Sequence, residues 1–301
     1  MTILRIGAEV VEVLAGGGAV VALESTIFSA LGLPAPTNRE VLADCLAAVR
    51  DAGATPAVCA VIDGVAVVGT TDFDRVLATN RKLGERDLPV AMATGVTGVT
   101  TVSATVAMAA AAGIEVFATG GIGGVHRGVE RTGDVSADLG AIARHPVVTV
   151  TAGVKGFLDV PRTIEHLEML GVPVIGWQTE ELPAFWSRTS GIRLDQRVDD
   201  VATMADIVRA ARSMQSRTGL VLAVPCPATE SIDAHDLAPV IDAALQDAER
   251  AGVASGAVTP YVLERIFVAT NGRSIVANRA LAVQNAQIAA ALALALGATS
   301  L

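Results

Sequence analysis

The chain of 301 residues is 51% hydrophobic and 18% charged, which predicts a globular protein with a sizeable core and excludes a disordered one. Its formal net charge of −9 would repel nucleic-acid polymers and anionic membrane surfaces, so we expect neither as a partner. The cysteines Cys45, Cys59 and Cys226 are widely spaced without a CxxC pair, which argues against a disulfide framework or a zinc site and favours a cytoplasmic location.

The apolar segments do not have the pattern of a signal sequence or a membrane span. Arg5 and Glu9 interrupt the first ten residues, so secretion is not expected. The alanine-rich stretch 102–114 stops at Glu115, and the apolar stretch 288–298 is shorter than a bilayer requires.

Apolar β-branched runs alternate with helical patterns in the first hundred residues, which indicates an α/β fold. We expect a buried strand at 20–23 that ends at Glu24, and then a helix capped by Asn38 that runs to about residue 51. Strands at 58–62 and 65–68, joined by Asp63-Gly64, predict a tight hairpin, so the sheet should be mixed.

The remainder continues the alternation. A helix is expected at 100–112 and a strand at 114–118, followed by a glycine-rich segment. Asp134, Ser136 and Asp138 are expected to open the next helix, which precedes a strand at 147–151. Helices at 161–170 and 201–214, strands at 172–175 and 220–224, and a mostly helical end from residue 235 complete the prediction. We find neither a linker nor a repeat, and expect one domain over residues 1–301, a three-layer α/β/α sandwich with a mixed central sheet.

Lysine is almost absent: of the 22 basic residues, all but Lys82 and Lys155 are arginine. Arginine carries charge and binds phosphate but stays protonated, so a position that needs a neutral amine must remain lysine. Lys155 follows the strand 147–151 among apolar neighbours that disfavour a charged amine, and could form a Schiff base. A lysine reaching from a strand end to solvent, or biased codon usage, would explain the same residues.

Glu24 also follows a strand, at the sheet rim where a general acid would be useful, although a solvated or capping carboxylate is an equally simple interpretation. The segment 120–128 offers backbone N–H groups for an anion, but its spacing is not the GxGxxG of a dinucleotide site. Within it, His126 is either a ligand contact or a loop residue. On one helical turn Asp134 and Asp138 could hold a hard cation, while N-capping would also explain Asp134 and Ser136.

Taken together, these motifs closely resemble the pseudouridine-5'-phosphate glycosidase family. The residues that carry the resemblance run in order through nearly the whole chain: 22–27, 53–57, 86–89, 100–102, 116–130, 134–139, 152–155, 182–185 and 272–274, with Asn278. The run from Phe117 to Gly128 is the most specific of them.

The resemblance implies a homotrimer with an Mn²⁺-type cation that splits pseudouridine 5'-phosphate, reversibly, into uracil and ribose 5-phosphate. It places the nucleophile on Lys155, the proton donor on Glu24 and the metal ligand on Asp134. The implied substrate contacts are Lys82, Val102, Ser136, Ala137 and Asp138, and further active-site positions fall on His126 and Asn278. Both lysines of the chain therefore coincide with functional positions of the family.

Three segments depart from the family pattern. Ser29-Ala30-Leu31-Gly32 stands where His-Gly is usual, Val96 replaces a frequent lysine, and 224–228 reads Val-Pro-Cys-Pro-Ala instead of Asn-Pro-x-Pro-Glu. Two other functions share some of these features: a Schiff-base lyase or aldolase acting on another sugar phosphate or C-nucleoside phosphate, and a non-catalytic nucleotide-binding module.

Overall fold

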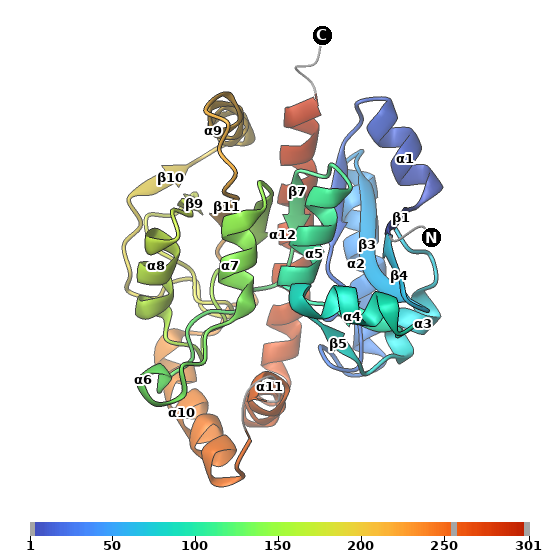
Figure 1. The fold of residues 1–301 in the computed structure, drawn as a ribbon. Coiled ribbons are helices and arrows are strands. Elements are labelled where there is room, and N and C mark those ends of the chain that lie inside the picture. Colours follow the sequence, from blue (N-terminus) through green and yellow to red (C-terminus); the bar gives the residue numbers. More distant parts are fainter. Residues whose placement is uncertain (1–3, 254–257, 298–301) are drawn as a thin grey trace.

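The computed structural model describes residues 4–253 and 258–297 and is built on an eleven-stranded sheet with helices on both faces (Figure 1). The strands are β1 (Leu4–Ile6), β2 (Val20–Leu23), β3 (Thr55–Ile62), β4 (Val65–Val68), β5 (Lys82–Leu83), β6 (Gly98–Thr100), β7 (Val116–Ala118), β8 (Val148–Thr151), β9 (Val174–Trp177), β10 (Gln196–Val198) and β11 (Leu220–Ala223). Their main order is β1-β4-β3-β2-β7-β8-β11-β9-β10, with β6 pairing β3 and β5 pairing β6.

The sheet is mostly parallel, and the predicted mixed sheet is confirmed. Strand β3 runs antiparallel to β4, with Cys59 opposite Val68, and antiparallel to β6. The predicted hairpin at Asp63-Gly64 joins β3 and β4, and both residues have the positive φ that a tight turn requires. The central strands β2, β7, β8 and β11 are buried throughout, as expected for strands covered on both faces.

Helices form the two outer layers. They are α1 (Ala8–Ala15), α2 (Thr37–Asp51), α3 (Phe73–Ala78), α4 (Leu88–Ala93), α5 (Val102–Ala111), α6 (Val129–Thr132), α7 (Ala137–Arg144), α8 (Val160–Met169), α9 (Val201–Ser213), α10 (Ala234–Arg250), α11 (Val258–Ala269) and α12 (Arg273–Gly297), with a 3-10 turn η1 (Glu85–Asp87). Figure 1 shows α5 and α7 in front of the sheet and α12 behind it, while α10 and α11 extend beyond the strand ends.

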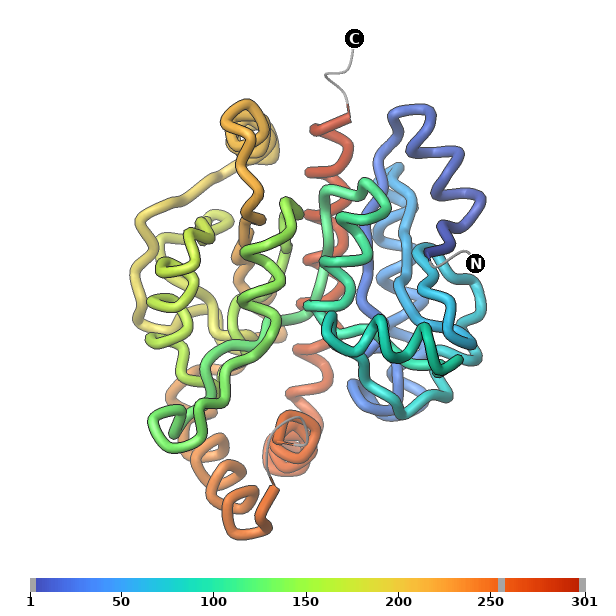
Figure 2. Tube along the Cα trace, in the orientation of Figure 1, coloured from blue at the N-terminus to red at the C-terminus, as the bar shows by residue number. Residues whose placement is uncertain are grey.

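Helix α12 occupies the centre of the molecule and packs against α2, α9, β2, β7 and β8. In the trace of Figure 2 it runs between the side formed by the first hundred residues and the side formed by the middle of the chain. We expected the apolar stretch 288–298 to be too short for a membrane span, and this expectation was wrong about length. The helix that contains this stretch begins at Arg273 and is long and apolar enough to span a membrane. Residue 298 itself lies outside the described residues. Half of its most apolar window is buried against these elements, which makes it the core helix of the fold.

Two local predictions were wrong. Asn38 does not cap α2, because the helix begins at Thr37; its side chain is buried and donates a hydrogen bond to the carbonyl of Phe28 (3.2 Å), holding the loop after β2. Asp134 and Asp138 do not share a helical turn, because α7 begins at Ala137 with Ser136 as its N-cap. The Ser136 Oγ accepts from the N–H of Asp138 (3.2 Å), so N-capping by Ser136 is confirmed.

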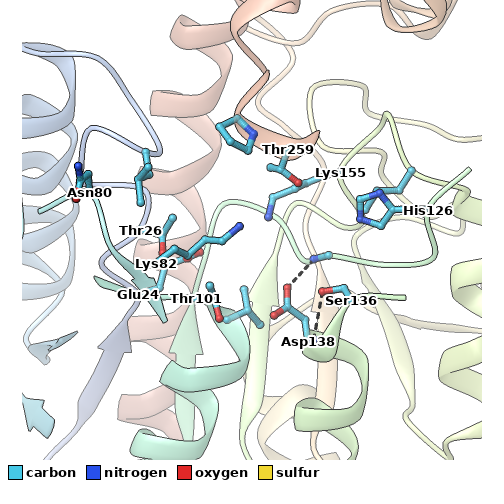
Figure 3. A pocket seen from close by; sticks show the side chains of 15 residues that line it. Glu24, Thr26, Asn80, Lys82, Thr101, His126, Ser136, Asp138, Lys155 and Thr259 are labelled. Atoms are coloured by element: carbon cyan, nitrogen blue, oxygen red, sulfur yellow. Dashed lines mark hydrogen bonds between the residues drawn. The ribbon is translucent and has the colours of Figure 1, made fainter. Parts of the chain in front are cut away.

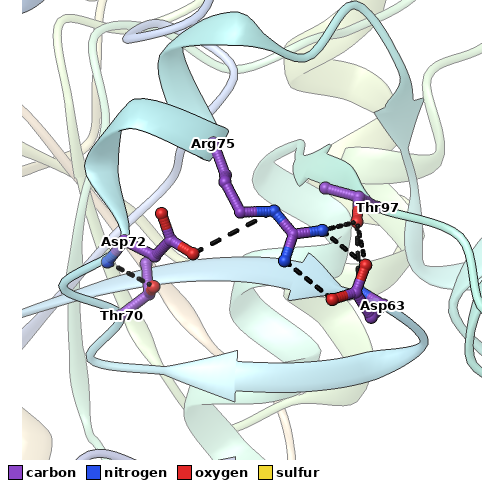
Figure 4. Close-up of polar contacts among 5 residues, drawn as sticks. All are labelled: Asp63, Thr70, Asp72, Arg75 and Thr97. Carbon is purple, nitrogen blue, oxygen red and sulfur yellow. Dashed lines mark hydrogen bonds and ion pairs between the residues drawn. The ribbon is translucent and has the colours of Figure 1, made fainter.

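Several short elements were not predicted, among them α3 and β6, and they are tied together by polar side chains. Arg75 on α3 donates to the Oδ2 of Asp63 in the β3–β4 turn (2.7 Å) and to the Oγ1 of Thr97 (2.9 Å), beside Asp72 and Thr70 (Figure 4). These groups are largely exposed, so the network fixes loop geometry more than it stabilises the fold.

Candidate active site

A pocket of roughly 450 Å³ opens at the carboxyl ends of the central strands, where open α/β sheets bind ligands. Its charged groups come from four separate segments: Glu24 follows β2, Lys82 lies on β5, Asp138 is in the first turn of α7, and Lys155 follows β8. Figure 3 shows the side chains of Lys82 and Lys155 pointing toward each other across this pocket, with Glu24 and Asp138 below them.

Glu24 is the buried acid of the pocket, only 8% exposed. Because Leu23 is paired with Ala118 in the parallel ladder between β2 and β7, the next residues, Glu24 and Thr119, come to lie side by side. The Thr119 hydroxyl donates a hydrogen bond to Glu24 Oε1. Burial raises the pKa of Glu24 to about 7, against the opposing effects of Lys155 and the Thr119 hydroxyl, so this group can give up a proton near neutral pH.

Lys155 is half-buried and is held by the backbone around it. Its N–H donates to the carbonyl of Ile122 (3.1 Å), which connects the loop after β8 to the glycine-rich loop after β7. Gly153 precedes it with φ +85°, and a Cβ there would lie 2.0 Å from the carbonyl oxygen of Pro183, so the turn that aims Lys155 requires glycine. The lysine amine thus enters the pocket from a fixed turn, opposite the acid.

Lys82 enters the pocket from the short strand β5. The residue as a whole is exposed, but partial burial of its ammonium end lowers its pKa, and the nearby charge of Lys155 acts in the same direction. Two lysine side chains therefore face one small space, and the ammonium of Lys82 favours an anionic substrate such as a phosphate ester.

Asp138 has a structural function at the pocket wall. Its Oδ1 accepts from the N–H of Ser103 (3.0 Å) and its Oδ2 from the N–H of Gly123 (2.9 Å), so both oxygens are engaged by backbone donors. This carboxylate fixes the glycine-rich loop against α5, next to Val102 and Ser136, which also line the pocket.

His126 stands between this pocket and a neighbouring hollow lined by Asp134, Arg127 and Arg131. Its Nδ1 lies 3.8 Å from the Oδ2 of Asp134, and burial lowers its pKa. Within residues 4–253 and 258–297 no group of three His, Cys, Asp or Glu side chains could form a protein-only metal cage. A hard cation that keeps most of its water and binds through a single carboxylate would still fit at Asp134.

Seven of the predicted site residues line the one pocket: Glu24, Lys82, Val102, His126, Ser136, Asp138 and Lys155. Three do not. Ala137 is exposed at the start of α7, Asp134 lines the neighbouring hollow, and Asn278 on α12 accepts a hydrogen bond from Trp186 Nε1 (2.7 Å). Gly123, from the segment 120–128 that was expected to offer backbone N–H groups, also lines the pocket, and the sequence reasoning missed the pocket residues Thr26, Leu31, Asn80, Thr101, Leu158, Thr259 and Pro260.

For some of these, a signal was present in the sequence. Thr26 and Thr101 lie inside motifs that carried the family resemblance, and Asn80 lies two residues before Lys82. Thr259 and Pro260 lie on α11, more than a hundred residues after Lys155, and no local pattern relates them to the sheet edge.

Comparison with known proteins shows the family to which this chain belongs. The model of the family "Indigoidine synthase A like protein" matches residues 9–295. The chain belongs to this family, which includes the pseudouridine-5'-phosphate glycosidases. Two curated members have that enzyme name: one from Herpetosiphon aurantiacus is 49% identical over 98% of this chain and 99% of its own length, and one from Solibacter usitatus is 47% identical over 96% and 98%.

Solved structures of the same fold agree with this assignment to the indigoidine synthase A-like family. The prealnumycin C-glycosynthase AlnA, solved in complex with ribulose 5-phosphate, is 35% identical with a TM-score of 0.91 and covers 99% of this chain and 98% of its own. An indigoidine synthase A-like protein from Thermotoga maritima is 32% identical with a TM-score of 0.89, covering 98% and 97%. The predicted α/β class and family are thus confirmed.

The departures from the family pattern can now be placed. Leu31, from the Ser29–Gly32 segment, lines the pocket, whereas Val96, Val224 and Ala228 do not. Of the three unusual segments, only the one that contains Leu31 contributes a side chain to the candidate active site.

Proposed function

We propose that this chain cleaves the carbon–carbon glycosidic bond of pseudouridine 5'-phosphate, reversibly, to give uracil and ribose 5-phosphate. The observation that carries the proposal is that Lys155 and Glu24 line one pocket of a chain that matches pseudouridine-5'-phosphate glycosidases along nearly their whole length. An amine nucleophile and a carboxylic acid with a pKa of about 7 are the two groups that this reaction needs.

A C–C glycosidic bond has no heteroatom leaving group, so protonating a leaving atom and adding water is not sufficient. The electrons of the broken bond need an acceptor. We propose that Glu24 protonates the ribose ring oxygen while the uracil ring supplies the electron pair that opens the sugar. The Lys155 amine then adds to C1'.

The Lys155 nitrogen must lose a proton after it adds to C1', and we propose that Glu24, now ionised, takes this proton and passes it to C5 of uracil. The bond between C1' and C5 then breaks: its electron pair stays with the uracil ring, and the electron pair of the Lys155 nitrogen forms the C1' iminium. Water hydrolyses the iminium to ribose 5-phosphate and a protonated Lys155 amine, whose proton returns to Glu24. In the whole cycle one water is consumed, and Lys155 and Glu24 both return to their starting states.

We propose that Lys82 and the Ser136–Ala137–Asp138 segment hold the phosphate or the sugar, and that Val102 and His126 complete the contacts. The Lys82 ammonium and the Ser136 hydroxyl, which both line the pocket, can replace the water around a phosphate ester. Asn278 lies outside the pocket lining, so its proposed contribution is to hold the buried side chain of Trp186.

We propose that Asp134 holds a divalent cation of the Mn²⁺ type, with water in the remaining positions and His126 beside it. A bound cation would add positive charge near an anionic substrate, and the steps above do not pass through it.

We further propose a single domain over residues 1–301, a homotrimer and a cytoplasmic location. The continuous sheet supports the first, the family resemblance the second, and the three buried, free cysteines the third. Light scattering is expected to give three times the 30.6 kDa chain mass.

The test of the function is uracil release. The purified protein is incubated with pseudouridine 5'-phosphate, with and without Mn²⁺, beside Lys155→Arg, which keeps the charge but cannot form a Schiff base. We expect uracil from the parent protein and a loss of at least about 10³-fold in Lys155→Arg. Borohydride with ribose 5-phosphate should attach the sugar to Lys155, and release of a different product, or no adduct at this residue, would contradict the proposal.

A further inference from the structure

The Glu24 carboxyl is held by a side chain that the sequence analysis did not consider. Thr119 is 4% exposed and follows β7 as Glu24 follows β2, so the parallel register places both side chains in the same relation to the sheet. Its hydroxyl has one proton, and that proton is donated to Glu24 Oε1. This bond does not engage the second carboxyl oxygen, Oε2, and Glu24 lines the pocket.

The backbone of Thr119 is in turn held on both sides. Its N–H donates to the carbonyl of Val150 on β8 (3.0 Å), and its carbonyl accepts from Asn285 Nδ2 on α12 (2.7 Å). The same amide nitrogen lies 3.4 Å from the carbonyl oxygen of Gly120. One buried side chain of α12 therefore restrains the first two residues of the glycine-rich loop.

The buried position of Asn285 lowers the stability of the fold. It is fully buried, and its Oδ1 is one of two buried side-chain atoms without a hydrogen-bond partner among the residues that the structure describes. A buried acceptor without a partner costs free energy, so the fold alone gives no reason for an amide here. Its Nδ2 bond to the Thr119 carbonyl gives that reason.

We propose that Thr119, held in place by Asn285, is the positioning residue of the acid Glu24 and directs the transferable proton to Oε2. A neutral carboxyl accepts hydrogen bonds best at its carbonyl oxygen, so a donor fixed on Oε1 makes Oε2 the oxygen that carries the proton. The chain Asn285–Thr119–Glu24 thus runs from the central helix to the reacting atoms.

The inference rests on the proposed function only for its kinetic consequences, and its test has two separate readouts. Thr119→Val keeps the shape of the side chain and removes the hydroxyl, whereas Thr119→Ser keeps the hydroxyl. The matched control is Thr149→Val, which removes a buried hydroxyl on the adjacent strand β8. The oxygen of this hydroxyl has no hydrogen-bond partner in the described part of the chain.

The first readout is the titration of Glu24, followed through the infrared carbonyl band of the protonated acid and assigned by its loss in Glu24→Gln. The hydroxyl bond favours the ionised form, so its removal is expected to move the titration midpoint upward by about one pH unit in Thr119→Val. Thr119→Ser and Thr149→Val should titrate like the parent. An unchanged midpoint in Thr119→Val overturns the inference whether or not the protein releases uracil.

The second readout is kinetic. We expect Thr119→Val to lower kcat by roughly 10- to 100-fold with KM within about threefold, and Thr119→Ser to restore most of it, since a bond to a charged group is lost and regained. A parent protein that releases no uracil contradicts the proposed function and leaves the titration result standing. An active parent matched by Thr119→Val contradicts the present inference alone.

Discussion

At the scale of single residues, the pocket contains a proton donor, Glu24, and an amine nucleophile, Lys155, whose protonation requirements are opposite. Glu24 is buried and must lose a proton during the reaction, while Lys155 must present a free electron pair. Burial acts on the acid because the ionised carboxylate loses hydration, and the nearby Lys155 charge offsets only part of that cost. The acid is therefore protonated at neutral pH more often than an exposed glutamate would be.

This predicts the pH dependence of the reaction. The proton donor must be protonated, so kcat/KM for uracil release should fall as pH rises through about 7. Glu24→Gln is expected to remove this limb and lower kcat by about 10²- to 10⁴-fold. Glu115→Gln is the control, because burial also raises the pKa of Glu115, but that residue lies outside the pocket beside Arg212. A limb near 7 that persists in Glu24→Gln would assign the titration to another group.

Individual residues also show how far the sequence could predict the site. Lys155 and Glu24 were recognisable because Glu24 directly follows β2 and Lys155 lies in the loop after β8, and the carboxyl ends of these buried strands meet at one edge of the sheet. The position of Asp138 could not be read in the same way, since its oxygens are engaged by Ser103 and Gly123, 35 and 15 residues away. A carboxylate that looked like a metal ligand is instead held by backbone N–H groups.

At the scale of elements, the glycine-rich loop after β7 is packed too closely at Gly123 to accept a side chain. A Cβ on Gly123 would lie 2.2 Å from Ser136 Oγ and 2.8 Å from Asp138 Oδ2. The loop therefore packs directly against the start of α7 at the pocket wall, and this packing requires that residue 123 has no Cβ.

Gly123→Ala should consequently displace Ser136 and Asp138 and disturb the substrate contacts more than the fold. We expect KM for pseudouridine 5'-phosphate to rise about tenfold or more, because substrate positioning depends on sub-ångström placement. Gly140→Ala is the matched control on the same helix, α7; its Cβ meets only the flexible end of Arg144, and alanine favours a helix. Equal KM values for the two variants would refute this account of the loop.

The long elements were predictable from periodicity, and the short ones were not. Strands β2 and β8 and helices α2 and α9 lie within one or two residues of their expected positions, because apolar spacing decides them. Elements such as β5 and β6, with two and three residues, exist only because neighbouring strands pair with them. The helix expected from residue 100 begins at Val102 instead, because Thr100 is the last residue of β6 and Thr101 is the N-cap of the helix.

At the scale of the whole molecule, the acid that serves catalysis weakens the fold. The pKa of Glu24 rises from an ordinary 4.5 to about 7 in the folded state, so folded protein binds this proton more tightly than unfolded protein does. The resulting stabilisation is complete below about pH 4.5 and is lost as pH rises through about 7. Above that pH, the buried carboxylate costs about 3 kcal/mol relative to low pH.

Glu24→Gln should therefore be more stable than the parent at alkaline pH, and the difference should shrink toward pH 4.5. Urea unfolding of both proteins at an acid and an alkaline pH measures this directly, with Glu115→Gln again as the comparison. If the stability difference between Glu24→Gln and the parent stays constant with pH, burial of the Glu24 carboxylate does not destabilise the fold.

Helix α12 has a consequence for how the protein is made. Residues up to Lys155 supply every proposed reacting group, yet the amide that restrains Thr119 belongs to Asn285 on α12, which is made after all of them. Because synthesis proceeds from the N-terminus, the nucleophile and the acid leave the ribosome before this helix does. A polypeptide that ends before Asn285 therefore contains both reacting groups without the amide that holds Thr119 beside the acid.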